Sequence, residues 1–486
     1  MTPDSLFFEA RQRRRTGRAL EAEKIYRQLL ARWPEHPPAH NNLAQLLLER
    51  CDTANAERHL RWAQALAPSF VDALLNHGIA ADATGDLATA VSRFARACRL
   101  NPTGALGWNN LGNALRQIGH TGMAEVAQRR AVALEPQSET WWSNLANTQR
   151  EAGQPKQAAR ALAHALILRP NFLPAVFNRA LVRLSCGDFK GGWQDYRARH
   201  AAGHGRPCPL PQPEWNGEAL SGALAVWGEQ GLGDEIMFGS ILPDIPLPRS
   251  ALVVETDPRL VPLIARSFPG LRAVARTQTP QPVLLAAERQ IALPDLAGRL
   301  RANTAAFPKR LQFLRADPER SKLLRSSLKT IAKGKPLVGV VWRSGRPGSG
   351  ALRSLSIAHA ARLVMDHCVF LNLQHNESEA EACALEAAGL NRISGLDLWS
   401  DIDGLAALLS ALDLLVSVDT ATMHLGAALG VPTWALLPAT ADWRWGHVEE
   451  RSLWYSSVRL FRQRQPLVWD GVVERVRAAL VEHPWA

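Results

Sequence analysis

Small and apolar residues recur every 34 positions through roughly the first 200 residues of the chain. Prolines fall at this interval, and small or apolar residues precede each proline by 24, 12 and 5 positions. A period of this length predicts pairs of antiparallel helices, with small residues where two helices touch and proline after the second helix. The prolines are Pro34, Pro68, Pro102, Pro136 and Pro170, and the alanines twelve positions earlier are Ala22, Ala56, Ala90, Ala124 and Ala158.

The hydrophobic pattern changes after a segment at 201–222 that is rich in Pro and Gly and is typical of an ordered linker. Short, continuously apolar runs then alternate with helix-like stretches, which predicts parallel sheets covered on both faces. We expect a Rossmann-like half at 223–332 and a second at 333–486, which ends in a helix. The predicted strands lie at 223–227, 251–255, 336–342, 368–373, 413–418 and 432–437, and the final helix at 469–483.

The repeat of residues 1–200 resembles the tetratricopeptide repeat, and a sixth, atypical unit begins near residue 173. Asparagine also recurs with this period, although it is a poor residue for a helix interior. A column of carboxamides on the inner surface of a superhelix can bind the backbone of an extended peptide. Alternatively, each Asn bonds the neighbouring repeat and stiffens the array. A similar ladder occurs in O-linked N-acetylglucosamine transferases. The candidate peptide-binding residues are Asn42, Asn76, Asn110, Asn144 and Asn178, with Asn113 and Asn147 on the same helical face.

Composition narrows the class of protein. The 486 residues are 47% hydrophobic and 21% charged, and the early acids and later basic run at the N-terminus do not resemble a secretory signal, so we expect a cytoplasmic, globular protein without a transmembrane segment. The net charge of +11 suits a phosphorylated substrate as well as a nucleic acid, and we expect no nucleic-acid partner. The six cysteines form no C-x-x-C pair. They indicate small buried thiols, with neither a disulfide framework nor a metal site.

Two strand ends carry candidate chemistry. The segment WGEQGLGDEIMF (227–238) predicts a turn in which Gly231 and Gly233 let a ligand approach the backbone. Asp234 either caps the following helix or acts as a general base at the mouth of a cleft. The segment SVDTATMHLG (417–426) predicts a helix start whose free N–H groups bind phosphate, and His424 within that helix favours a structural hydrogen bond over catalysis.

A third strand leads into a loop, WRSGRPGSGALRS (342–354), whose arginines can clamp a diphosphate. We favour Arg343 and Arg353 over Arg346 for this role. Gln374 follows another strand, where a nucleotide base or ribose can lie. The run at 439–463 is rich in Trp, Arg and Tyr, and its aromatic side chains either fill the core or wall the donor site. The D-x-D at 401–403 precedes an apolar helix and indicates capping.

Together these blocks resemble the bacterial tetratricopeptide-repeat glycosyltransferases, which include flagellin glycosyltransferases. The catalytic part is similar to ADP-heptose:lipopolysaccharide heptosyltransferases, and the resemblance implies the two-Rossmann B-type fold. It also implies that Asp234 is the general base and that no cofactor is needed beyond a nucleotide-sugar co-substrate. The segment that holds the donor's phosphates is then Asp419, Thr420, Ala421, Thr422, Met423 and His424, and the most specific block is DTATMHLGAALGVP.

The leading hypothesis is an inverting, metal-independent O-glycosyltransferase that acts on Ser or Thr of an acceptor protein held by the repeats, with flagellin as a candidate. The transferred sugar is a hexose, a heptose or a nonulosonic acid. One alternative is a heptosyltransferase-like enzyme of lipopolysaccharide or glycan synthesis. Another is a repeat adaptor whose transferase domain is inactive.

Overall fold

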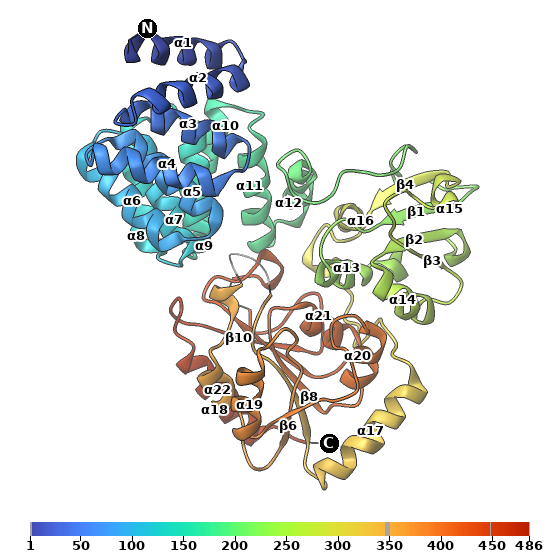
Figure 1. Ribbon diagram of the computed structural model, residues 1–486. Coiled ribbons are helices and arrows are strands. Elements are labelled where there is room, and N and C mark those ends of the chain that lie inside the picture. The colour runs from blue at the N-terminus through green and yellow to red at the C-terminus, as the bar shows by residue number, and fades with distance from the viewer. Residues whose placement is uncertain (1, 346–349, 448, 486) are drawn as a thin grey trace. The chain divides into compact units, whose positions relative to one another are not determined.

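The computed structural model describes residues 2–345, 350–447 and 449–485. Its internal contacts divide the chain into two compact units, Met1–Pro170 and Asn171–Ala486. We call them the first unit and the second unit and describe each by itself (Figure 1).

The first unit consists of antiparallel helix pairs, as the 34-residue period predicts. The alanines of the predicted contact column, from Ala22 to Ala158, are all fully buried. Gly78 shows why this packing admits only small residues, because a Cβ atom there would lie 2.4 Å from the Phe94 ring. The helices are α1 (Pro3–Arg15), α2 (Ala19–Arg32), α3 (Pro37–Glu49), α4 (Thr53–Leu66), α5 (Val71–Thr84), α6 (Leu87–Leu100), α7 (Ala105–Gln117), α8 (Thr121–Leu134), α9 (Glu139–Glu151) and α10 (Pro155–Leu168).

A pair of histidines in the first unit makes its stability depend on pH. The Nδ1 atoms of His40 on α3 and His59 on α4 lie 2.9 Å apart, and His40 Nε2 bonds the carbonyl of Pro34. Burial, and then the charge of His40, lower the pKa of His59 from 6.5 to about 4. The folded state therefore favours the neutral ring, so this contribution to stability is complete above about pH 6.5 and is lost as the pH falls toward 4.

We predict that acidification from about pH 7 to about pH 4.5 lowers the Tm of the wild type more than that of His59→Gln, which has no titrating ring at position 59. Thermal unfolding followed by circular dichroism at several pH values measures this difference. An identical fall of Tm in both proteins would contradict the assignment.

The second unit begins with α11 (Leu173–Ser185), α12 (Phe189–Tyr196) and the 3-10 turn η1 (Arg197–Arg199). The contact boundary after Pro170 thus differs from the expected repeat boundary at residue 200. The indole of Trp193 on α12 donates to the carbonyl of Arg301 at 2.9 Å, which ties this helix pair to the α/β region. The segment at 201–222 is pinned to the edge of the first sheet by hydrogen bonds from Trp215 N to Gln290 O (2.8 Å) and from Gln290 N to Pro213 O (3.1 Å).

The α/β region contains two parallel sheets in the described part of the chain. The first half has the strand order β3-β2-β1-β4, and the second half has the order β10-β9-β8-β5-β6-β7. In the first half lie β1 (Leu224–Trp227), α13 (Leu232–Gly239), β2 (Leu252–Thr256), α14 (Val261–Ser267), β3 (Arg272–Ala275), α15 (Pro282–Leu285), β4 (Arg289–Ala292) and α16 (Leu293–Leu300).

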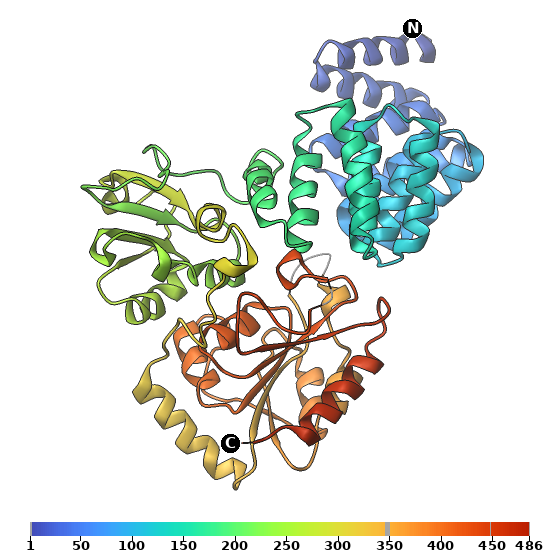
Figure 2. The same cartoon turned by 180° about the vertical axis from the view of Figure 1, so that it is seen from behind.

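The second half is entered through α17 (Pro318–Ala332) and closed by α22 (Asp470–Glu482). These two helices, yellow and red in Figure 2, flank opposite sides of the second sheet. Its other elements are β5 (Leu337–Val341), α18 (Ile357–Arg362), β6 (Val369–Asn372), α19 (Glu379–Ala387), β7 (Leu390–Arg392), α20 (Ile402–Leu409), β8 (Leu414–Val418), α21 (Ala421–Ala428), β9 (Thr433–Leu437) and β10 (Val458–Arg462).

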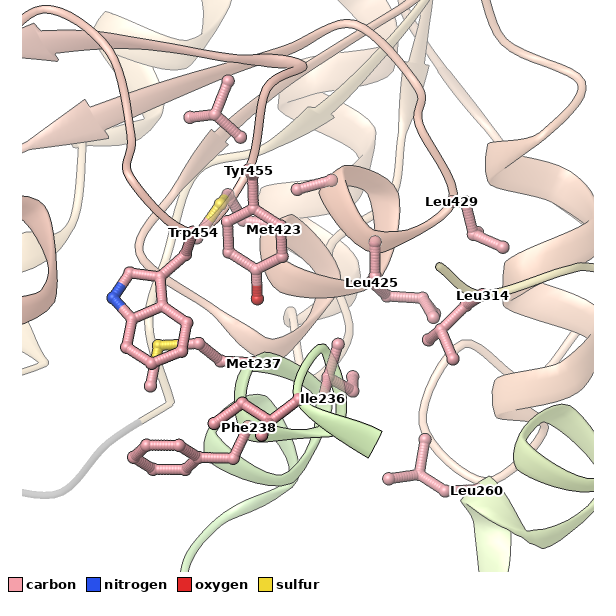
Figure 3. Packing of buried hydrophobic residues seen from close by; sticks show 14 of the residues in the cluster. Ile236, Met237, Phe238, Leu260, Leu314, Met423, Leu425, Leu429, Trp454 and Tyr455 are labelled. Atoms are coloured by element: carbon pink, nitrogen blue, oxygen red, sulfur yellow. The ribbon is translucent and has the colours of Figure 1, made fainter. Parts of the chain in front are cut away.

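One apolar cluster runs through both halves. Figure 3 shows Ile236, Met237 and Phe238 of α13 beside Met423 and Leu425 of α21, together with Trp454 and Tyr455. Burial of these side chains holds α13 against α21. The strand ends after β1 and after β8 are therefore brought to the same place.

The thiols differ from expectation. Cys98 and Cys368 are buried, whereas Cys51, Cys186, Cys208 and Cys383 are exposed, and all six are free. The expectation of buried thiols is wrong for those four, because each lies in a loop, or on the outer face of a helix, that contacts solvent.

Candidate active site

Asp234 lies in the first turn of α13 and faces the second half. The N-cap of α13 is Gly231, which has no side-chain capping bond, so Asp234 does not serve as the cap. Its Oδ1 lies 2.7 Å from Nη2 of Arg444, and 22% of its side chain is exposed. The carboxylate is therefore held across the junction of the two halves while part of it stays accessible, as a base requires.

The two glycines before Asp234 have different surroundings. A Cβ on Gly231 would meet nothing closer than Asp234 at 3.8 Å, so the turn is open there. A Cβ on Gly233 would lie 2.9 Å from the His424 ring and 3.4 Å from the Ala421 backbone. Gly233 thus allows α13 to approach α21, which is a packing reason for glycine and differs from the expected approach of a ligand.

The strand end after β8 turns into α21 through Asp419 and Thr420. Thr420 is the N-cap, and its hydroxyl accepts from the Met423 backbone N–H at 3.4 Å. Thr422 and Met423 are buried. Thr420 and Ala421 are only half-buried, so they are the members of this segment that stand toward solvent at the positive end of the helix.

Asp419, His424 and Tyr455 form a buried polar chain. His424 Nδ1 lies 2.8 Å from the Tyr455 hydroxyl, and His424 Nε2 lies 3.6 Å from Asp419 Oδ1. Burial alone would raise the pKa of Asp419, but the bond with His424 and the charge of Arg353 hold it below its usual value. Burial raises the pKa of Tyr455 well above the usual range. His424 therefore links a permanent carboxylate to a neutral phenol, in agreement with the structural role expected for it.

The two favoured arginines of the β5 loop have different partners. Arg353 Nη1 donates to Asp419 at 2.9 Å, and its Nη2 lies 3.8 Å from Asp442. Arg343 instead donates to Glu381 at 2.7 Å and to the carbonyl of Asn376 at 2.6 Å, so its guanidinium is held by the first turn of α19 and by the loop before it. Arg346 lies outside the described residues.

Gln374 is buried after β6, and its side chain is occupied. Its carbonyl oxygen accepts from the Arg343 backbone N–H at 2.9 Å, and its amide group donates to the His375 carbonyl at 2.8 Å. In this arrangement the side chain joins the ends of β5 and β6. The D-x-D residues have the expected structural role, because Asp401 caps α20 by accepting from Gly404 N at 2.8 Å.

Arg444 is the site residue that sequence reasoning did not single out. It lies in the 3-10 turn η7 (Trp443–Trp445), and its side chain is only 11% exposed. Burial alone would lower its pKa, but the carboxylates of Asp234, Asp442 and Asp419 raise it above the ordinary value, so the guanidinium stays charged. The only signal in the sequence was the Trp- and Arg-rich run after β9.

The turn that carries Asp234 is supported from the helix pair at the start of the second unit. Arg199 is fully buried and pairs with Glu229 (2.6 and 2.9 Å) and with Asp295 (2.8 Å, twice). Beside it, Gln230 donates to the Tyr196 hydroxyl at 2.9 Å. Glu229 and Gln230 immediately precede Gly231, so these contacts fix the turn from which α13 begins.

The asparagine column is engaged between neighbouring repeats. Asn76 donates to Asn41 of the preceding repeat at 2.7 Å, and Asn144 donates to Asn109 at 2.8 Å. Bonds of this kind, between neighbouring repeats, are what the alternative interpretation predicts, in which the asparagines stiffen the array. Asn76 is buried, and the other members are half-buried: Asn42, Asn110, Asn113, Asn144, Asn147 and Asn178.

Further bonds tie three of these carboxamides to other side chains. Asn42 donates to the Tyr26 hydroxyl at 3.0 Å, Asn113 accepts from Gln128 at 3.0 Å, and Asn147 accepts from Arg150 at 2.7 Å. A half-buried carboxamide with one such bond retains further donor or acceptor capacity.

Comparison with known proteins agrees with this architecture. Residues 366–465 match the profile of Glycosyltransferase family 9 (heptosyltransferase), and residues 9–70, 47–105 and 75–139 match a tetratricopeptide-repeat profile. Protein FlbA of Caulobacter vibrioides is 31% identical over 493 residues, which span 96% of this chain and 82% of FlbA. The chain therefore belongs to the family of FlbA, as a tetratricopeptide-repeat protein with a family 9 domain, and it is a glycosyltransferase.

Solved structures of repeat proteins are similar to part of the chain. A thermophilic TPR protein of Thermus thermophilus is 23% identical, with 38% of this chain and all of that chain covered, at a TM-score of 0.32. YrrB, described as a TPR protein with an unusual peptide-binding site, is 17% identical, with 36% and 90% covered, at a TM-score of 0.30.

Within 2–345, 350–447 and 449–485, no helix has the length and apolar character needed to cross a membrane. Over the same ranges, no three side chains of His, Cys, Asp or Glu are grouped to hold a metal ion.

Proposed function

We propose that this glycosyltransferase moves a sugar from a nucleotide-sugar donor to a Ser or Thr hydroxyl of an acceptor protein. The observation that carries the proposal is the placement of Asp234. This partly exposed carboxylate of the first half lies 2.7 Å from a guanidinium of the second half, beside the positive start of α21. A base and an anion-binding loop are thus adjacent, which is the arrangement that transfer from a sugar diphosphate requires.

The proposed reaction is a single displacement. Asp234 takes the proton of the acceptor hydroxyl as its oxygen forms a bond to the anomeric carbon, and the bond from that carbon to the phosphate oxygen breaks. The electron pair leaves with the nucleoside diphosphate, and attack from the opposite face inverts the anomeric configuration. Arg353 and the backbone N–H groups at the start of α21 supply the positive charge that stabilises the leaving group. The proposed mechanism therefore needs no metal ion.

The repeats supply the acceptor in this proposal. Tetratricopeptide repeats commonly bind proteins, and the half-buried carboxamides of the asparagine column offer donors and acceptors for an extended backbone. Flagellin is the first acceptor to test, because the sequence resembles a group that includes flagellin glycosyltransferases.

A second candidate function is sugar transfer to lipopolysaccharide or another glycan. The match of residues 366–465 to the heptosyltransferase family favours it, since that profile covers the strand end and helix start of the proposed donor site. The transferred sugar is then a heptose, whereas the first proposal, with its nucleoside diphosphate leaving group, also admits a hexose.

Intact masses from three strains separate the two candidates: the parent, a deletion of this gene, and the deletion complemented with the wild-type gene. The proposal predicts that flagellin loses sugar-sized mass increments in the deletion and regains them on complementation. Unchanged flagellin together with a truncated lipopolysaccharide would establish the second function instead.

A further inference from the structure

Charges alternate in sign across the junction of the two halves. Arg444 lies 2.7 Å from Asp234 and 3.3 Å, through its Nε, from Asp442. Arg353 lies 3.8 Å from Asp442 and 2.9 Å from Asp419. Two guanidinium groups are thus shared among three carboxylates, all of them largely buried.

Among the described residues, three polar atoms of this cluster, at and beside Arg444, lack a hydrogen-bond partner. Its Nε and the Oδ1 atoms of Asp234 and Asp442 are buried, yet none of them makes a well-aligned hydrogen bond. Buried charged groups usually satisfy their hydrogen bonds, so Arg444 Nε keeps a donor for an anionic partner, and Asp234 Oδ1 keeps the capacity to accept a proton. A diphosphate offers several charged oxygens and matches the planar fork of arginine better than the single carboxylate oxygen now facing it.

We propose that Arg444 binds the diphosphate of the donor and, when it is unoccupied, holds the carboxylate of Asp234; this inference rests on the proposed function. Donor phosphates and Asp234 then compete for one guanidinium. When the donor binds, its phosphates pair with Arg444 in place of Asp234. The freed carboxylate can then remove the proton of the acceptor hydroxyl, so the base is available only when a sugar donor is bound. The transfer step forms and breaks the same bonds as in the proposed reaction.

Competition for a shared group has a thermodynamic consequence. Two partners that compete weaken each other by the same factor, so removal of the Asp234 charge strengthens diphosphate binding. The effect must pass through Arg444 and disappear when Arg444 is absent. If the ion pair were only structural, or if Asp234 simply repelled a diphosphate, the gain in affinity would not depend on Arg444.

The test is a double-mutant cycle on the full-length protein. Isothermal titration calorimetry measures binding of ADP, UDP and GDP separately to the wild type, Asp234→Asn, Arg444→Met and the double variant. For a nucleoside diphosphate that binds the wild type, we expect about tenfold tighter binding by Asp234→Asn and at least about tenfold weaker binding by Arg444→Met. The double variant should match Arg444→Met.

A second ion pair provides the matched control. Arg266 on α14 and Asp403 on α20 also join the two halves at 2.7 Å, away from the strand ends of the site. Asp403→Asn and Arg266→Met should leave diphosphate affinity unchanged. Circular dichroism of each variant, and Arg444→Lys as a folded variant that keeps the charge, separate weak binding from loss of structure.

Three results would overturn the inference. Wild-type affinity in Arg444→Met would remove Arg444 from the diphosphate site. An equal gain from Asp234→Asn with and without Arg444 would show repulsion without competition. Both results leave the proposed function intact. Failure of the wild type to bind any of the three nucleotides, in contrast, would overturn this inference together with the proposed class of donor.

Discussion

Replacement of Asp234 by Asn is expected to lower the rate of sugar transfer by about 10²–10⁴-fold, the usual cost of losing a general base. Asn has the same shape but does not accept a proton from the acceptor hydroxyl. Because the Asp234 side chain is partly exposed and forms no cap, the fold should persist. Complementation of the deletion strain with Asp234→Asn, followed by the intact mass of flagellin, measures the effect in cells.

The control for this variant is Asp403→Asn. Its carboxylate also pairs with an arginine of the other half, Arg266, but it lies on α20, away from the site. Transfer should stay within about twofold of the wild type, since only a partly exposed ion pair is lost. If Asp234→Asn kept wild-type transfer, Asp234 would not be the base. If the protein acts only as an adaptor, both variants restore the wild-type phenotype.

The largest expected loss of stability comes from Arg199→Met. Arg199 and Glu229 are fully buried, and the guanidinium also binds Asp295, so the variant leaves two carboxylates without their cation. Removal of one partner of a buried ion pair costs about 3–5 kcal/mol. The cost falls on the turn before Asp234, so the second unit should unfold at a clearly lower temperature, as scanning calorimetry of the full chain will show.

Arg197→Met is the matched control for Arg199→Met. Arg197 is two residues away in η1 and pairs with Glu214, but its side chain is 56% exposed. An exposed ion pair contributes about 0–1 kcal/mol, so the Tm should hardly change. Equal destabilisation by the two variants would contradict the assignment of Arg199 as the buried anchor of this turn.

Local sequence patterns predicted the repeats and the interior of the sheets. Pro34 and its counterparts end helices, and Ala22 and its counterparts allow close packing, so each position has a local cause. The six predicted strands all exist. Within the described residues, four further strands were missed because they are short or carry arginine, as β3 does with Arg272. A short polar run has no distinct strand signal.

The site was predictable only where a residue lies in the segment that leads from a predicted strand into the next helix. Asp234 and Asp419 are such residues, and burial of the apolar face of α13 against α21 brings them together. Arg444 lies 210 residues after Asp234, so their pairing depends on tertiary contacts that no local pattern contains. Arg343 and Gln374 lie after predicted strands, but the sequence pattern does not identify their partners. Arg343 bonds Glu381 and the Asn376 carbonyl. Gln374 bonds the Arg343 backbone N–H and the His375 carbonyl.

Transfer between purified components tests the central proposal most directly. The wild-type protein and Asp234→Asn are incubated with unglycosylated flagellin and each candidate nucleotide-sugar, and intact mass spectrometry follows the flagellin. The proposal predicts one or more sugar-sized increments, on Ser or Thr, with the wild type and one class of donor, and about 10²–10⁴-fold slower addition with Asp234→Asn. Unmodified flagellin with every donor, alongside transfer to purified lipopolysaccharide, would contradict it.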